Sequence, residues 1–145
     1  MDPSVTLFGP VDTYLAPVIG YVLLALILLN VLGRGIEYRR IAKQAKDGAD
    51  AVSRNPLRVA TNFLLVVGGF YYLTVNRHAG LVVSLFVVAM VVADVFEFES
   101  RKVEARQDWD VERPWGSLAA SGFALAYIAY QTLFFLVRPF WSAIV

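Results

Sequence analysis

The sequence of 145 residues contains no cysteine and only one histidine, His78. Without cysteine the chain can form neither a disulfide nor a thiolate metal site. A single histidine cannot supply both ligands of a bis-histidine haem. The patterns G-x-S-x-G and H-E-x-x-H and a phosphate-cradling glycine loop are also absent. We therefore expect no enzymatic activity, no catalytic residues, no metal ligands and no bound cofactor.

Charged residues are scarce as well. They make up 17% of the chain, and hydrophobic residues make up 58%. A typical soluble domain is about 25% charged and about 45–50% apolar. The formal net charge of +1 gives no indication of a nucleic-acid partner.

Long apolar runs account for this composition, and each has about the 20 residues that a helix needs to cross a bilayer. They cover residues 14–33, 57–75, 79–98 and 115–137. Open strands cannot satisfy their backbone in lipid, and barrel strands would be shorter and would alternate in polarity. The sequence therefore predicts an all-α fold, an integral membrane four-helix bundle that forms a single transmembrane domain over residues 1–145 in the lipid bilayer.

The thirteen Lys and Arg residues are distributed unevenly along the chain. Seven lie in or beside the first loop and four in the third, whereas Arg77 and Arg138 lie on the other side. Basic residues concentrate in the cytoplasmic loops of membrane proteins. This predicts a multi-pass protein of the cell membrane, N-out and C-out, with both termini extracytoplasmic and loops 34–56 and 99–114 in the cytoplasm.

The two charged loops have helical features. Apolar residues recur at roughly helical spacing in the first loop, and Glu97 and Arg101 form an i,i+4 pair at the start of the third. Pro56 suits the first turn of the helix that follows. We expect the first and third membrane helices to extend beyond the bilayer, although a solvated basic loop beside anionic lipid head groups is an open alternative.

Asp94 is an acid inside a largely apolar run, about one turn from its end. Polar residues occur at the same depth in the other helices, which predicts a polar intramembrane layer made of Asn30, Asn62, Asp94, Ser117 and Ser121. In a structural role, Asp94 accepts hydrogen bonds across the bundle or pairs with Arg34 or Arg58. In a functional role, Asp94 is a proton or ion site, since ionisable groups within membranes often carry function.

The last membrane helix has two distinct sets of side chains. The small residues Ala119, Gly122, Ala126 and Ala129 would allow close helix packing. A second set is aromatic and consists of Phe123, Tyr127, Tyr130 and Phe134. Two explanations of these sets are open. One is ordinary packing and lipid contact, and the other is a docking face for a partner subunit or a flat cofactor tail. His78 is expected to be a solvent-facing residue of the outer turn.

Three segments carry a resemblance to a known group: "FYYLTVNRHAG" (70–80), "FEFESRKVEAR" (96–106) and "ERP" (112–114). Together they resemble small, uncharacterised membrane proteins of halophilic archaea. The resemblance implies no chemistry and no catalytic residue. Some small membrane proteins of this type accompany quinol-oxidising cytochrome b and Rieske complexes, and that is the one pathway the resemblance points to.

These observations favour a non-catalytic accessory or scaffolding subunit of a larger membrane protein complex, with other membrane subunits as partners. The resemblance points to a respiratory, quinol-oxidising complex. Two alternatives stay open. One is a small ion or proton-coupled transporter or channel that uses Asp94. The other is a quinone-binding subunit of a redox complex, built around Asp94, Tyr127 or His78.

Overall fold

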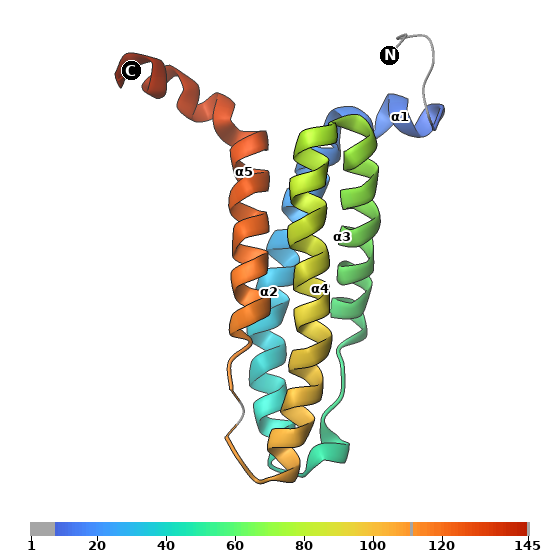
Figure 1. The fold of residues 1–145 in the computed structure, drawn as a ribbon, viewed down its shortest axis with the longest axis vertical. Helices are drawn as coiled ribbons and strands as arrows, with labels where there is room; N and C mark the ends of the chain where they lie inside the picture. The colour runs from blue at the N-terminus through green and yellow to red at the C-terminus, as the bar shows by residue number, and fades with distance from the viewer. Residues whose placement is uncertain (1–7, 111, 145) are drawn as a thin grey trace.

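The computed structural model describes residues 8–110 and 112–144, and every regular element there is helical (Figure 1). The α-helices are α1 (Pro10–Tyr14), α2 (Ile19–Ala45), α3 (Pro56–Val75), α4 (Arg77–Arg106) and α5 (Trp115–Ile144). Two short 3-10 helices, η1 (Ala16–Val18) and η2 (Ala49–Ala51), lie in the connections.

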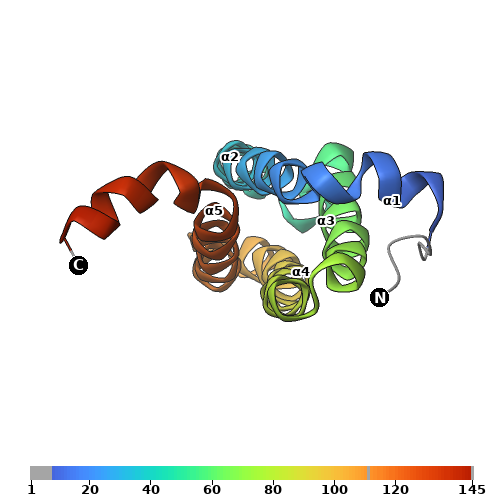
Figure 2. The same ribbon diagram turned by 90° about the horizontal axis from the view of Figure 1, so that it is seen from above.

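The four long helices α2–α5 alternate in direction and form one bundle (Figure 1). Seen from above, they stand at the corners of a square, with α5 packed against both α4 and α2 (Figure 2). Among the described residues, four helices are long and apolar enough to cross a membrane. The predicted all-α membrane bundle is confirmed, and the chain is a multi-pass membrane protein.

Capping asparagines set where α3 and α4 begin. The side chain of Asn55 accepts a hydrogen bond from the Leu57 N–H, and Pro56 occupies the first position of α3. Asn76 alone separates α3 from α4, and it caps α4 by accepting from the Ala79 N–H. A Cβ atom at Gly80 would lie 2.2 Å from the Leu73 backbone, so only glycine permits this tight turn.

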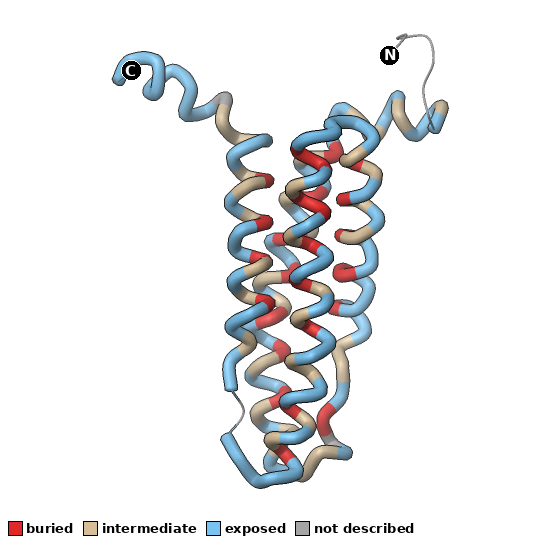
Figure 3. Tube along the Cα trace, in the orientation of Figure 1, coloured by how far each residue is buried: buried red, intermediate tan, exposed pale blue. Residues whose placement is uncertain are grey.

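The buried residues recur along each helix on the side that faces the bundle axis, and most residues on the outward faces are exposed (Figure 3). Apart from Ser84, the buried residues between the Asn76 turn and the middle of the bundle are mostly apolar, and Leu23, Ile27, Leu65, Val83, Val87, Met90 and Ile128 pack together there. Large apolar residues such as Phe63 and Leu85 point outward. This inverted surface is what lipid-facing helices require.

Helices α2 and α4 continue beyond the starts of α3 and α5, to Ala45 and Arg106. The predicted extension of the first and third membrane helices is therefore confirmed. A second small core of Ile41, Val52 and Ala105 holds the extensions together. We call this end of the bundle, with segments 46–55 and 107–114, the loop end, and the opposite end, with the Asn76 connection, the turn end.

At the turn end, both ends of the described chain leave the bundle (Figures 1 and 2). The last part of α5, which includes Pro139, bends to one side, and α1 runs to the other side. Helix α1 is tied to the bundle because the Tyr71 hydroxyl donates to Asp12 at 2.7 Å. The last turns of α5 have a hydrophobic surface, because Phe140, Trp141 and Ile144 are exposed there.

Candidate functional site

Asp94 is 8% exposed and sits on the axis side of α4, between the apolar core and the loop end. It lies seventeen residues after Arg77, which places it about 25 Å along the helix at 1.5 Å per residue. A carboxylate at this position needs partners, because an unpaired buried charge is very costly.

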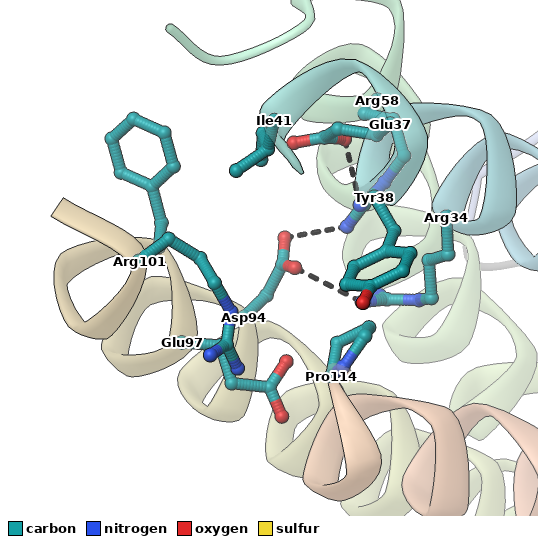
Figure 4. Close-up of a pocket in the computed structure, with 10 residues that line it drawn as sticks. Arg34, Glu37, Tyr38, Ile41, Arg58, Asp94, Glu97, Arg101 and Pro114 are labelled. Atoms are coloured by element: carbon teal, nitrogen blue, oxygen red, sulfur yellow. Dashed lines mark hydrogen bonds and ion pairs between the residues drawn. The ribbon is translucent and has the colours of Figure 1, made fainter. Parts of the chain in front are cut away.

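Side chains from three other segments supply those partners, and Figure 4 shows two of them, Arg34 and Arg58. The Asp94 Oδ1 atom accepts a hydrogen bond from Arg34 Nη1 of α2 at 2.9 Å. Its Oδ2 atom accepts from Asn62 Nδ2 of α3 at 2.7 Å and lies 2.7 Å from Arg58 Nη2. Arg54, just before α3, adds a longer contact of 3.3 Å to the same oxygen. One carboxylate thus joins α2, α3 and α4.

Arg58 extends the network, because its Nη1 atom donates to Glu37 Oε2 of α2 at 2.7 Å. We call the set Arg34, Glu37, Arg54, Arg58 and Asp94 the ion cluster. It contains three guanidinium groups and two carboxylates. The cluster therefore carries one excess positive charge.

A chain of hydrogen bonds links the ion cluster to the apolar core. Asn30 Nδ2 donates to Asn62 Oδ1 at 2.7 Å and to Thr61 Oγ1 at 3.0 Å. Asn62 in turn donates to Asp94. The structure thus brings together three of the five residues of the predicted polar layer, Asn30, Asn62 and Asp94.

The other two residues of the predicted layer lie apart from Asp94 in the hydrogen-bond pattern. The Ser117 N–H and hydroxyl donate to the Glu97 carboxylate, which joins α5 to α4. The Ser121 hydroxyl donates to the Leu118 carbonyl of its own helix, at 3.0 Å. The loop end therefore has a second, smaller polar junction instead of one continuous layer.

The sequence reasoning missed Glu37, Thr61 and Arg54. A signal for Glu37 was available, since the buried stripe of α2 runs through Ile27, Asn30, Arg34 and Glu37 at intervals of three and four residues. An acid that continues an apolar stripe into a charged extension is a candidate for a buried ion pair. Arg54 lies outside any helix, so helical spacing gives no information about it.

A cavity of about 30 Å³ lies against the cluster, which is room for one or two water molecules. Three arginines and three acids line it, since Arg101 and Glu97 join residues of the cluster. Among the described residues, no group of three or more His, Asp or Glu is placed to hold a metal ion. The arrangement suits a balanced, hydrated junction between helices.

The small-residue set on α5 lies away from the bundle axis. Ala119, Gly122 and Ala126 are exposed, and a Cβ atom at Gly122 would have no neighbour within 4 Å. The buried side of α5 carries Ser117, Ser121, Ala124 and Ile128 instead. Ala119, Gly122 and Ala126 therefore do not pack against another helix of the bundle, because α5 is rotated so that they point outward.

The aromatic set of α5 is partly exposed on the same helix. The ring of Phe123 stacks on Phe86 of α4 with centroids 5.7 Å apart, and Tyr130 contacts both Tyr127 and Phe134. Ala129 lies beside Tyr130 in an apolar hollow that continues to Trp141. At the turn end, His78 is exposed, as the sequence predicted.

A family model described as "Domain of unknown function (DUF7313)" matches residues 2–145. No curated protein and no solved structure has a significant match to the chain. The chain belongs to the DUF7313 family, whose description assigns no activity, so a function has to be inferred from the geometry.

Proposed function

We propose that this protein is a non-catalytic accessory subunit of a membrane protein complex, and that the outward face of α5 is where it binds its partner. The observation that carries the proposal is the exposure of Ala119, Gly122 and Ala126 along one side of α5. Small residues at such spacing let the backbones of two membrane helices approach closely.

The surroundings of this face support the proposal. Gly122 has open space where a side chain would be, so a partner helix can approach the α5 backbone there. Phe123 and Tyr130 are 62% and 55% exposed beside it and offer large rigid contact surfaces. The bent end of α5, with Phe140 and Trp141 exposed, extends the apolar surface at the turn end.

The contacts of Asp94 favour a structural role for this residue over a role in transport. Both carboxylate oxygens are engaged by guanidinium or amide groups, so the acid has cation partners in place. Between this site and the turn end, the described core is filled by residues such as Leu65, Val83 and Met90. A transporter or channel that uses Asp94 would need polar groups along that stretch.

Two finer statements belong to the same proposal. The excess of Lys and Arg near the loop end favours a cytoplasmic loop end and extracytoplasmic termini. Cysteines introduced at the exposed positions Lys43, Arg77 and Arg106 test this with an impermeant thiol reagent on intact cells. Only the cysteine at position 77 is expected to be labelled, and labelling at the other two positions instead would reverse the orientation.

The second finer statement concerns the partner. A respiratory, quinol-oxidising complex is the partner class that the sequence resemblance favours.

Gly122→Leu tests the partner face. The variant should keep the thermal stability of the isolated bundle, because Gly122 is exposed and a Cβ atom there would have no neighbour within 4 Å. It should lose the subunits that co-purify with the wild type in mild detergent. Ala89→Leu places the same leucine side chain on an exposed position of α4 and is the matched control.

The co-purifying material also separates the alternatives. Cytochrome-containing subunits would support the respiratory assignment, and bound quinone that is lost in a Tyr127→Phe variant would favour a quinone-binding subunit instead. A homo-oligomer without other subunits, which conducts protons or ions in liposomes, would replace the proposal with the transporter. Unchanged co-purification in Gly122→Leu would exclude this face of α5.

A further inference from the structure

We propose that a groove between α2 and the start of α5, at the loop end, binds the phosphate group of an anionic phospholipid. The groove has a volume of about 280 Å³ and is lined by Arg34, Gly35, Tyr38, Arg39, Arg113 and Leu118, together with Pro114. This site is separate from the α5 partner face and goes beyond the proposed assembly role.

Among the described residues, the lining of the groove is basic and contains no acid, and of its arginines only Arg34 is paired with a carboxylate, that of Asp94. Arg34, Arg39 and Arg113 contribute three guanidinium groups, and no acid lines it among the described residues. Arg39 and Arg113 are exposed and so are free to turn toward a ligand. Arginine is suited to phosphate because its planar fork can donate two parallel hydrogen bonds to two oxygens.

Arg34 is the buried residue of the groove lining. Its side chain is 0% exposed, and only its Nη1 atom is engaged, by Asp94. Its Nε and Nη2 atoms have no hydrogen-bond partner among the described residues. Buried donors without partners are costly, and a water molecule that bridges them to a phosphate oxygen would satisfy them.

The position of the groove favours a lipid over a soluble phosphate. It lies where the membrane-spanning part of α5 begins, at Trp115. Trp115 is 65% exposed, and the Arg113 guanidinium lies 5.9 Å from its ring centroid. Exposed tryptophan beside arginine is typical of the level at which head groups lie, and basic pockets between membrane helices bind anionic head groups. Leu118, one turn further into the membrane, offers an apolar contact to an acyl chain.

Gly35 keeps the groove open. Gly35 lines the groove and is exposed, and a Cβ atom at this position would have no neighbour within 4 Å, so a side chain can be added there. This provides a way to block the site without removing any charge. It complements the removal of the two exposed arginines.

The experiment measures lipid retention by native mass spectrometry and thermal stability in mild detergent, with added phosphatidylglycerol, phosphatidylcholine or inorganic phosphate. Wild type should retain phosphatidylglycerol in preference to phosphatidylcholine and should melt at a higher temperature in its presence. Arg39→Gln/Arg113→Gln should bind phosphatidylglycerol more weakly, by about fivefold for each arginine removed. Gly35→Leu should lose retention while its melting temperature in phosphatidylcholine stays at the wild-type value.

Lys46→Gln/Arg106→Gln removes the same charge at exposed loop-end positions outside the groove, and it should retain the lipid as wild type does. Equal loss in this control, or equal retention of both lipids by wild type, would reduce the effect to general surface charge and overturn the proposal. Equal stabilisation by inorganic phosphate at the same phosphate concentration would overturn the lipid assignment. Full retention in both Gly35→Leu and the double arginine variant would overturn the site itself.

Discussion

Two cavities at the loop end share Arg34, Tyr38 and Pro114, yet they differ in charge. The cavity on the bundle axis has three arginines and three acids in its lining, whereas the groove beside α5 has three arginines and no acid. The same Arg34 guanidinium is neutralised by Asp94 through one nitrogen atom, and its other two nitrogen atoms have no hydrogen-bond partner among the described residues. Both cavities contain three arginines, so the difference between them lies in the acids. A cavity with acids is a structural junction, and a cavity without acids can bind an anion.

In the axial cavity, the acids neutralise the buried arginines and join three helices. Taking charges out of water is costly, and a buried ion pair repays that cost only when its remaining donors and acceptors are also satisfied. Asn62 and Asn30 help here, because they continue the hydrogen bonding from Asp94 toward the apolar core. The junction therefore specifies how α2, α3 and α4 fit together, and its members act as a unit.

The largest effect is expected when the acid of the axial cavity is removed. Asp94→Leu leaves Arg34 buried without a carboxylate and takes one of two carboxylates from Arg58. Breaking a buried pair in this way typically costs about 3–5 kcal/mol of folding free energy. Asp94→Asn keeps hydrogen bonding but not the charge, so its loss should be smaller. Thermal unfolding in detergent measures both, and a wild-type melting temperature for Asp94→Leu would contradict the structural role.

A paired variant sharpens this prediction. Arg34→Met combined with Asp94→Leu removes both charges, and Arg58 still has Glu37 as its partner. Replacement of a buried pair by apolar residues of similar volume is often neutral or stabilising. The double variant should therefore recover most of the stability lost in Asp94→Leu. No recovery would mean that the carboxylate matters for another reason than its charge.

A smaller effect is expected at Glu37. Glu37→Gln removes the charge that faces Arg58 at 2.7 Å, but Arg58 retains Asp94 and the amide can still accept a hydrogen bond. We expect a loss of about 1–3 kcal/mol in the free energy of unfolding, typical of a weakened buried polar contact. The measurement is chemical or thermal unfolding beside Glu99→Gln, a control on an acid that is mostly exposed. Equal stability of the two variants would remove Glu37 from the cluster.

The sequence predicted much of the fold and part of this site. Apolar runs and loop charges follow from local sequence, so the four helices and the extensions of α2 and α4 were predictable. Counting residues inward from the helix ends placed Asn30, Asn62 and Asp94 at one depth, and they are hydrogen-bonded to one another. Depth along each helix is therefore accessible from sequence when the boundaries are clear.

The rotation of each helix was less accessible. Gly122 and Ser121 are neighbours in sequence, and small residues are suited equally to a packed interior and to a partner face. Only the structure shows that Ser121 points inward and Gly122 outward. The groove beside α5 depends in addition on Arg113, which precedes its helix and is placed next to Arg39 by tertiary contacts alone. No local pattern predicts such a site.

The smallest effect on stability, and the clearest effect on binding, is expected when the groove is given the acid that it lacks. Arg39→Glu would make the groove resemble the axial cavity, with Arg34 and Arg113 facing a carboxylate. Arg39 is exposed, so the free energy of unfolding should change by no more than about 0.5 kcal/mol. Phosphatidylglycerol retention should fall below that of Arg39→Gln, because the new carboxylate both repels the phosphate and occupies the arginines. Arg106→Glu makes the same reversal outside the groove and should retain the lipid. If Arg39→Glu and Arg106→Glu retained phosphatidylglycerol equally, the two cavities would not differ in function, and the contrast in their acids would have no consequence for binding.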